Sequence, residues 1–253
     1  MPHTNIERIS RATSCARAFV QLLVVFLFFS VLPGELLAQV TPELCGPIAA
    51  SASDYRLPKS GYVNQVEGAH FPPHVELWIR GNRGHLGSDI DYTILRIPNH
   101  HRALISIARR AVEQKKDQLP NMTYPVECYF ERGIRFRADD HIVRMLYAQF
   151  LIDKARTADA GKQLELVAKM VSDNGFATYN IGLLYSDMKD YGQALAYAHK
   201  AMALGFDRPQ LRQRLESVGR WTEPTAESGG LPASAASAPA PISAASAPAT
   251  QTD

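Results

Sequence analysis

The sequence has few cysteines and no excess of positive charge. Three cysteines occur among 253 residues, and 27 lysines and arginines face 25 aspartates and glutamates. The cysteines form no CxxC pair, which is a common signature of a zinc site. Proteins that bind nucleic acid need a surplus of basic residues on the binding face. The balanced charge therefore argues against a nucleic-acid partner.

The common signatures of catalysis are also missing. Residues 81–87 read Gly-Asn-Arg-Gly-His-Leu-Gly, but they lack the Gly-Lys-Ser/Thr ending of a phosphate loop and no strand precedes them. Gly87-Ser88-Asp89 does not match the Gly-x-Ser-x-Gly pattern of a nucleophilic serine. No His-Glu-x-x-His motif occurs. We therefore expect no enzymatic activity and no cofactor, and we expect residues 81–87 to form a tight turn between helices.

The two ends of the chain have compositions that differ from the middle. Residues 1–38 resemble a secretory signal, with arginines before an apolar run over 18–32 and a small residue at Ala38. This predicts export, cleavage near Gln39 and a periplasmic protein without a stable membrane span. The alternative is an uncleaved segment that anchors the chain in the inner membrane. Residues 222–253 are rich in alanine, serine and proline and predict a disordered tail.

Export would leave two cysteines in the mature chain. Cys15 lies in the leader, whereas Cys45 and Cys128 remain. An isolated pair of cysteines in an exported protein is a disulfide candidate. Such a bond would attach the segment 39–65, which we expect to be irregular, to a helix near Pro125. The alternative is two separate buried thiols.

Residues 175–206 carry the clearest pattern in the middle of the chain. They read as two amphipathic helices joined by a short turn. The pattern-bearing positions are Thr178, Ile181, Gly182 and Tyr185 on the first helix and Ala194, Ala198 and Ala201 on the second. This spacing resembles the tetratricopeptide repeat, a helix-turn-helix unit of about 34 residues. Repeats of that family stack and bind other macromolecules.

The same pattern extends toward the N-terminus. A preceding unit begins near His141, and an earlier and longer one begins near His101. A fourth pair is read as helices over 72–80 and 88–96, and the segment 208–218 predicts a terminal helix that covers the end of the core. The predicted fold is all-α, a solenoid like that of tetratricopeptide repeats over residues 66–221. It has about three to four helix pairs and a C-terminal capping helix.

The resemblance implies a groove lined by the first helix of each pair. The corresponding residues are Arg102, Ile105, Arg109, Ile142, Met145, Gln149, Phe176, Tyr179 and Leu183. Arginines mixed with methionine and aromatic residues favour an extended peptide or protein partner in the bacterial envelope over a small ligand. The alternative for these residues is burial against the terminal helix 208–218.

Five of the eight histidines lie within residues 70–101. The surrounding string of Val66–Phe71, Ile79–Gly87 and Pro98–Arg102 resembles a group of exported proteobacterial proteins with tetratricopeptide repeats. That resemblance implies a fold and export but no activity.

The histidine-rich segment also suggests an alternative function, a metal-binding or enzymatic site. Its candidate ligands would be His70, His74, His85, Asp89 and Asp91. The simpler interpretation is that these polar groups cap helices and fill repeat junctions, with Asn99 as an N-cap.

Overall fold

The computed structural model describes residues 44–57 and 61–224. The chain divides into two compact units, residues 1–41 and 42–253, and the described residues all belong to the second. The predicted signal segment 1–38 and the predicted tail beyond residue 224 lie outside the described residues.

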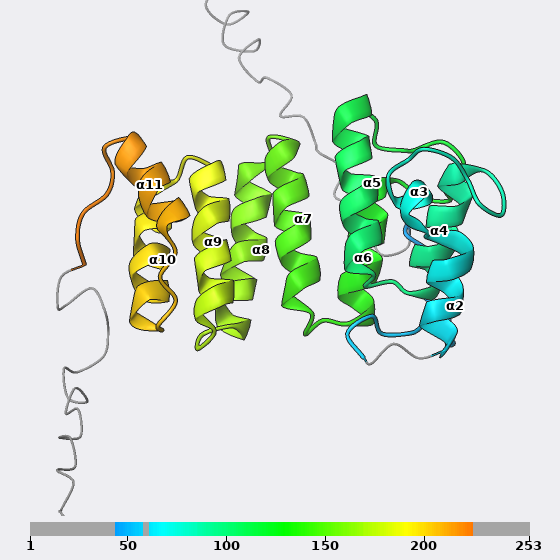
Figure 1. The fold of residues 1–253 in the computed structure, drawn as a ribbon, viewed down its shortest axis with the longest axis horizontal. Helices are drawn as coiled ribbons and strands as arrows, with labels where there is room; N and C mark the ends of the chain where they lie inside the picture. Colours follow the sequence, from blue (N-terminus) through cyan, green and yellow to red (C-terminus); the bar gives the residue numbers. More distant parts are fainter. Residues whose placement is uncertain (1–43, 58–60, 225–253) are drawn as a thin grey trace, which may run out of the picture. The chain divides into compact units, whose positions relative to one another are not determined.

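All regular secondary structure in the described residues is α-helical, which confirms the all-α prediction. The helices follow one another through the chain, and the longest connections between them are residues 77–85 and 115–125 (Figure 1). They are α2 (Gly61–His70), α3 (Pro73–Glu76), α4 (Leu86–Arg96), α5 (His101–Gln114), α6 (Val126–Phe136), α7 (His141–Asp153), α8 (Thr157–Met170), α9 (Gly175–Asp187), α10 (Tyr191–Ala203) and α11 (Pro209–Ser217).

Two predicted boundaries near the N-terminus are wrong. The irregular segment expected over 39–65 ends earlier, because α2 begins at Gly61. The helix expected over 72–80 is the single turn α3, since Trp78 adopts a left-handed backbone conformation with φ 57°. A residue in that conformation cannot continue a right-handed helix. The chain turns there instead of running on to residue 80.

A constant offset separates equivalent helices in the second half of the described chain. Helices α7 and α9 begin at positions 141 and 175, α8 and α10 at 157 and 191, and α9 and α11 at 175 and 209. The turns inside the two pairs also match. Ala155 and Lys189 are separated by the same offset, and both have positive φ. The amide that follows each of them bonds a carbonyl earlier in the chain, at Leu151 and Tyr185 respectively.

Side chains just before α7, α9 and α10 accept hydrogen bonds from the first backbone amides of these helices. Asp140 accepts from the amides of Ile142 and Val143 before α7, and Asn174 accepts from Ala177 before α9. An oxygen at this position replaces the hydrogen bonds that the first turn cannot make internally. The capping positions 140 and 174 differ by the same offset as the helices that follow them, so the repetition includes the helix starts.

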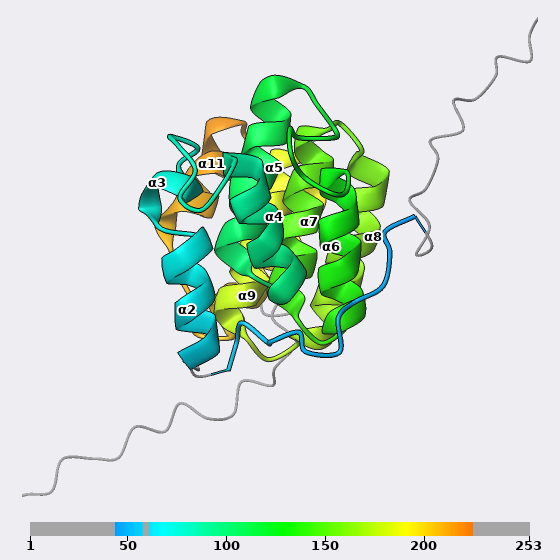
Figure 2. The ribbon, with the colours of Figure 1, turned by 90° about the vertical axis from the view of Figure 1, so that its right-hand side faces the viewer.

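The helices pack mainly on their sequence neighbours. Helix α9 packs on α10, α7 on α8, and α5 and α9 both contact α7. Figure 2 shows α6 and α8 on one flank of this row and α3 and α11 on the other. Figure 1 places α3 and α11 at opposite ends of the row. The two short helices therefore border the same flank from its two ends.

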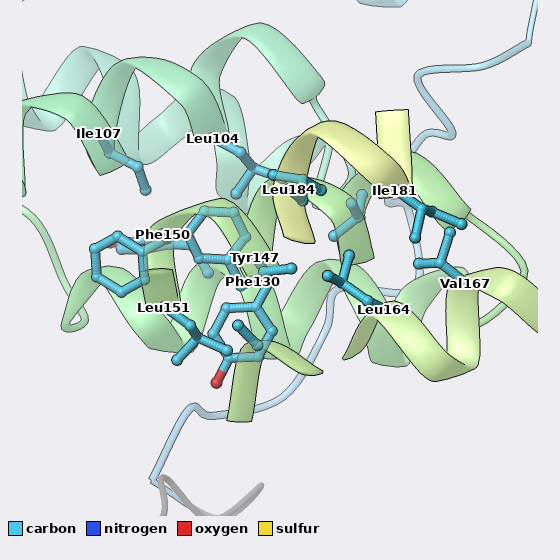
Figure 3. Close-up of a cluster of buried hydrophobic side chains, with 14 of the residues drawn as sticks. Leu104, Ile107, Phe130, Tyr147, Phe150, Leu151, Leu164, Val167, Ile181 and Leu184 are labelled. Carbon is cyan, nitrogen blue, oxygen red and sulfur yellow. The ribbon is translucent and has the colours of Figure 1, made fainter. Parts of the chain in front are cut away.

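The core runs between neighbouring helices as one continuous apolar cluster (Figure 3). Phe130 of α6 stacks on Tyr147 and Phe150 of α7, with ring centres 5.3 and 5.4 Å apart. Leu164 of α8 and Ile181 of α9 continue the cluster with no exposed surface. Burying this apolar stripe on successive helices is what stabilises the row.

Gly182 lets three helices meet closely. A methyl group at this position would lie 2.6 Å from the Leu211 side chain of α11 and 3.2 Å from Tyr197 of α10. A methyl group would therefore force the Leu211 side chain to move and would crowd Tyr197, so the lack of a side chain at residue 182 suits the close packing of α10 and α11 on α9.

The segment 44–57 contains no helix and is attached to α6. The sulfur atoms of Cys45 and Cys128 are 2.15 Å apart, which is disulfide distance and agrees with the predicted pairing. The Nη1 of Arg132, a residue with 2% of its surface exposed, donates to the carbonyls of Cys45 and Pro47 at 2.8 and 2.7 Å. A covalent link and a buried guanidinium thus hold the same piece of chain.

Candidate functional site

The nine residues predicted to line a groove come from α5, α7 and α9, and we call them the α5–α7–α9 face. Contacts at the two ends show which way this face points. On α5, Arg102 donates from Nε to Glu76 of α3 at 3.0 Å. On α9, the hydroxyl of Tyr179 accepts from the Leu211 amide of α11 at 3.0 Å. The face therefore lies on the flank that α3 and α11 border (Figure 2).

The middle of the face is incompletely covered. Ile142, Met145 and Gln149 of α7 are half-buried, as is Leu183 of α9. Met145 and Leu183 pack on the core along part of their surface, whereas Ile142 is not among the residues packed there. Half-exposed apolar side chains in a row are the usual lining of a groove that accepts an extended chain.

The end of the face at α11 is closed. Tyr179 keeps only 6% of its surface exposed because α11 lies over it. We therefore exclude Tyr179 from the binding surface, and for this residue the alternative of burial against the terminal helix holds. Phe176 remains outside, with 59% of its surface exposed, and its ring meets Phe206 edge-on at 5.5 Å.

The end of the face at α3 contains a hollow of about 240 Å³. Ile105 and Arg109 line it from α5, together with Arg102. The opposite wall is Leu77 and Trp78, which follow α3 directly. The sequence did not predict this wall, because the pattern of residues 72–80 indicates a continuous helix. The only local signal was the Gly-rich stretch that follows.

The proposed metal ligands are not brought together. The carboxylate of Asp89 meets His70 Nδ1 at 2.8 Å on one oxygen and the amides of Asn82 and Arg83 at 2.7 and 3.1 Å on the other. These bonds fold the 81–84 turn around Asp89. Burial by itself raises the pKa of Asp89, but the hydrogen bonds from these groups outweigh it and lower the pKa. The hydrogen bonds to Asp89 account for the turn over residues 81–84, which the glycines in this stretch predicted.

The other three candidates point elsewhere. Asp91 accepts from Thr123 Oγ1 at 2.7 Å and from the Tyr129 hydroxyl. His85 is exposed, and His74 is half-buried, with a buried Nε2 that has no hydrogen-bond partner among the described residues. No group of three or more histidine, cysteine, aspartate or glutamate side chains in residues 44–57 and 61–224 has the geometry of a metal site.

A buried polar cluster ties the N-terminal segment to the starts of α5 and α7. Asn99 has no exposed surface, and its Nδ2 donates to Asp54 at 2.7 Å and to Asp140 at 2.9 Å. Its Oδ1 accepts from the Tyr55 amide at 3.0 Å. The prediction that Asn99 caps a helix is therefore wrong. This side chain is used for tertiary contacts that no local pattern reveals.

The two carboxylates in this cluster are held ionised. Burial raises the pKa of Asp54, but hydrogen bonds from Arg56, Asn99 and Arg137 outweigh it and lower the pKa. The pKa of Asp140 is lowered in the same way by hydrogen bonds that include one from His101. Carboxylates with lowered pKa values are poor proton donors at neutral pH. The cluster is therefore suited to holding segments together and not to acid catalysis.

His100 is the residue that caps α5. Its Nδ1 accepts from the Ala103 amide at 3.2 Å, so the proton of the neutral ring lies on Nε2 and faces Glu67 at 3.1 Å. The imidazole has no exposed surface and stacks on Tyr55 with ring centres 4.2 Å apart. Burial lowers its pKa from 6.5 to about 4, which keeps it neutral.

We expect acidification from pH 6.5 to 4 to lower the free energy of unfolding. The unfolded chain takes up a proton at His100 in this range while the folded chain does not, so this residue alone lowers the free energy of unfolding by up to about 1.4 kcal/mol for each pH unit. Urea denaturation at several pH values measures the slope. His100→Asn, which retains a capping side chain, should reduce the slope. Equal slopes in the wild-type and His100→Asn proteins would contradict this assignment.

No model of a protein family, no curated protein and no solved structure matches the chain. Among the described helices, none combines the length and the apolar character required to cross a bilayer. The function is therefore inferred from the geometry of the α5–α7–α9 face and of the helices that border it.

Proposed function

We propose that this chain is an exported adaptor built from tetratricopeptide-like repeats, and that it holds an extended segment of a protein partner on the α5–α7–α9 face. The repeat part of the proposal is supported by the constant offset of helix starts and turns, which fits the family's unit of about 34 residues. Helix α11 begins at the same offset from α9 and would be the first helix of a further unit. No second helix follows it among the described residues. It thus fits the role of a capping helix.

The binding part of the proposal depends on one observation. Helices α3 and α11 border the two ends of the α5–α7–α9 face and leave α7 between them, with Ile142, Met145 and Gln149 only half-buried. A peptide laid across α7 would complete the burial of these side chains. Burial of apolar area is the main favourable contribution to such association.

Export is supported by the leader-like composition of residues 1–38 and by the Cys45–Cys128 pair at disulfide distance. Disulfides persist in oxidising compartments, of which the periplasm is one. We propose the periplasm as the location. We do not propose a metal or enzymatic role, because the candidate ligands His70 and Asp89 are engaged with each other and with the 81–84 turn.

A peptide selection tests the binding proposal. Random peptides displayed on phage are selected against the chain, and the dissociation constants of the recovered peptides are measured for wild type and for Met145→Glu. A charge in the middle of the half-buried strip should weaken binding about tenfold or more, as for a central interface residue.

Met170→Glu is the matched control. Met170 lies on α8, outside the α5–α7–α9 face, and exposes 40% of its surface. The same substitution there should change the dissociation constants less than about twofold, in keeping with the small effects of substitutions outside an interface. Circular dichroism shows whether both variants remain folded. Peptides that bind all three proteins equally would contradict the proposal, and so would a selection that recovers none.

A further inference from the structure

The hollow at the α3 end of the face carries one positive charge that is not neutralised. Three arginines and two glutamates line it. Arg102 is paired with Glu76, and Arg110 lies 3.3 Å from Glu113. Arg109 is exposed and has no ion pair with any described residue. An ionic group is thus presented to whatever enters the hollow.

The apolar wall of the hollow is already in place. Trp78 donates from Nε1 to Ser106 Oγ at 2.9 Å, and Ser106 Oγ donates to the Glu76 carbonyl at 2.7 Å. The Arg110 guanidinium lies 5.6 Å from the centre of the indole ring. These contacts hold Trp78 in a left-handed conformation, which is uncommon for a bulky residue and is often retained where it serves a binding site.

Leu77 lines this hollow and has 68% of its surface exposed. Exposed apolar side chains that lie next to one another often mark a contact surface. Leu77, Trp78 and Ile105 are apolar lining residues of the hollow that Arg109 also lines. The volume of about 240 Å³ suits one large side chain and a neighbouring polar group.

We infer that the hollow binds a carboxylate of the peptide partner together with an adjacent large apolar side chain. This inference deepens the proposed function and rests on it. The guanidinium of Arg109 donates charge-assisted hydrogen bonds to the carboxylate, and the apolar side chain packs between Leu77, Trp78 and Ile105. Because Trp78 is fixed before binding, little ordering of this wall is needed when the peptide enters.

The test uses two synthetic peptide pools with a fixed centre. One pool carries Phe-Asp between random positions, and the matched pool carries Phe-Asn. Binding of each fluorescein-labelled pool to the chain is followed by anisotropy. Loss of one charge-assisted bond corresponds to about tenfold in affinity, so the Phe-Asp pool should bind wild type about tenfold more tightly than the Phe-Asn pool.

Two pairs of variants locate the effect. Arg109→Gln should abolish the preference for the Phe-Asp pool, whereas Arg80→Gln, on an exposed arginine that does not line the hollow, should retain it. Leu77→Ser should weaken the binding of both pools. Ile79→Ser should not, although Ile79 is also 68% exposed, because it lies outside the hollow.

Equal binding of the two pools to wild type would overturn the inference, and so would a preference that survives in Arg109→Gln. No binding of either pool would overturn it as well. The proposed function is decided separately by the unrestricted selection with Met145→Glu. Peptides whose binding depends on Met145 but shows no preference for aspartate would support the proposed function and contradict only the inference of a carboxylate site.

Discussion

Replacing Cys45 and Cys128 together with alanine is expected to lower the free energy of unfolding by about 4 kcal/mol. The bond closes a loop with a sequence separation of 83, and for a loop of that size the chain-entropy treatment predicts roughly 4 to 5 kcal/mol as an upper limit. The segment 44–57 would remain attached through Arg132 and the Asn99 cluster. We therefore expect a less stable protein that still folds.

Urea denaturation with and without reductant measures this effect. Reductant should destabilise the wild-type protein by a similar amount and should leave the double alanine variant unchanged. A wild-type protein from an oxidising compartment that shows no response to reductant would contradict the disulfide. Two alkylated cysteines in the untreated mature protein would contradict it as well.

Asn99→Ala is expected to cost about 3 kcal/mol or more of stability, which is typical of removing one partner from a buried, charged network. The substitution leaves the carboxylates of Asp54 and Asp140 facing each other without the amide that bridges them, and it leaves the Tyr55 amide without its acceptor. Asp54 and Asp140 are buried, and each loses one of the hydrogen bonds that compensate for its desolvation. Arg56, Arg137 and His101 remain in contact with them.

Asn174→Ala is the matched control for this prediction. Asn174 is an exposed asparagine that caps α9 through the Ala177 amide at 3.0 Å. Loss of a helix cap typically costs about 1 kcal/mol. Similar losses for Asn99→Ala and Asn174→Ala in urea denaturation would show that Asn99 acts only locally, which contradicts its role as the centre of the cluster.

The helices of the second half could be predicted because their patterns are local and dense. Residues 141–206 place apolar and small side chains at helical spacing throughout, and the structure has four helices there. In α2 the only buried residues are Val63 and Val66, so the apolar stripe is too thin to be distinguished from an irregular segment. Where the pattern weakens, packing against other parts of the chain decides the structure.

The candidate site could be predicted only in part, for a similar reason. The face positions follow from helical spacing, but spacing alone does not show which of them another helix covers. Tyr179 is covered by α11. The wall around Trp78 arises from a backbone turn with no clear local signal in the sequence. Asn99 shows the same limit, because its position before a helix resembles a cap while its partners, Asp54 and Asp140, lie far away in the sequence.

Photo-crosslinking of a selected peptide tests most directly whether the partner lies on the α5–α7–α9 face. A peptide recovered from the unrestricted selection carries a benzophenone group in place of one residue, and mass spectrometry of the irradiated complex identifies the attached residues. We expect attachment on α5, α7 and α9, at the half-buried positions Ile105, Ile142, Met145, Gln149 and Leu183. Attachment confined to α6 or α8, on the opposite flank, would contradict the proposal.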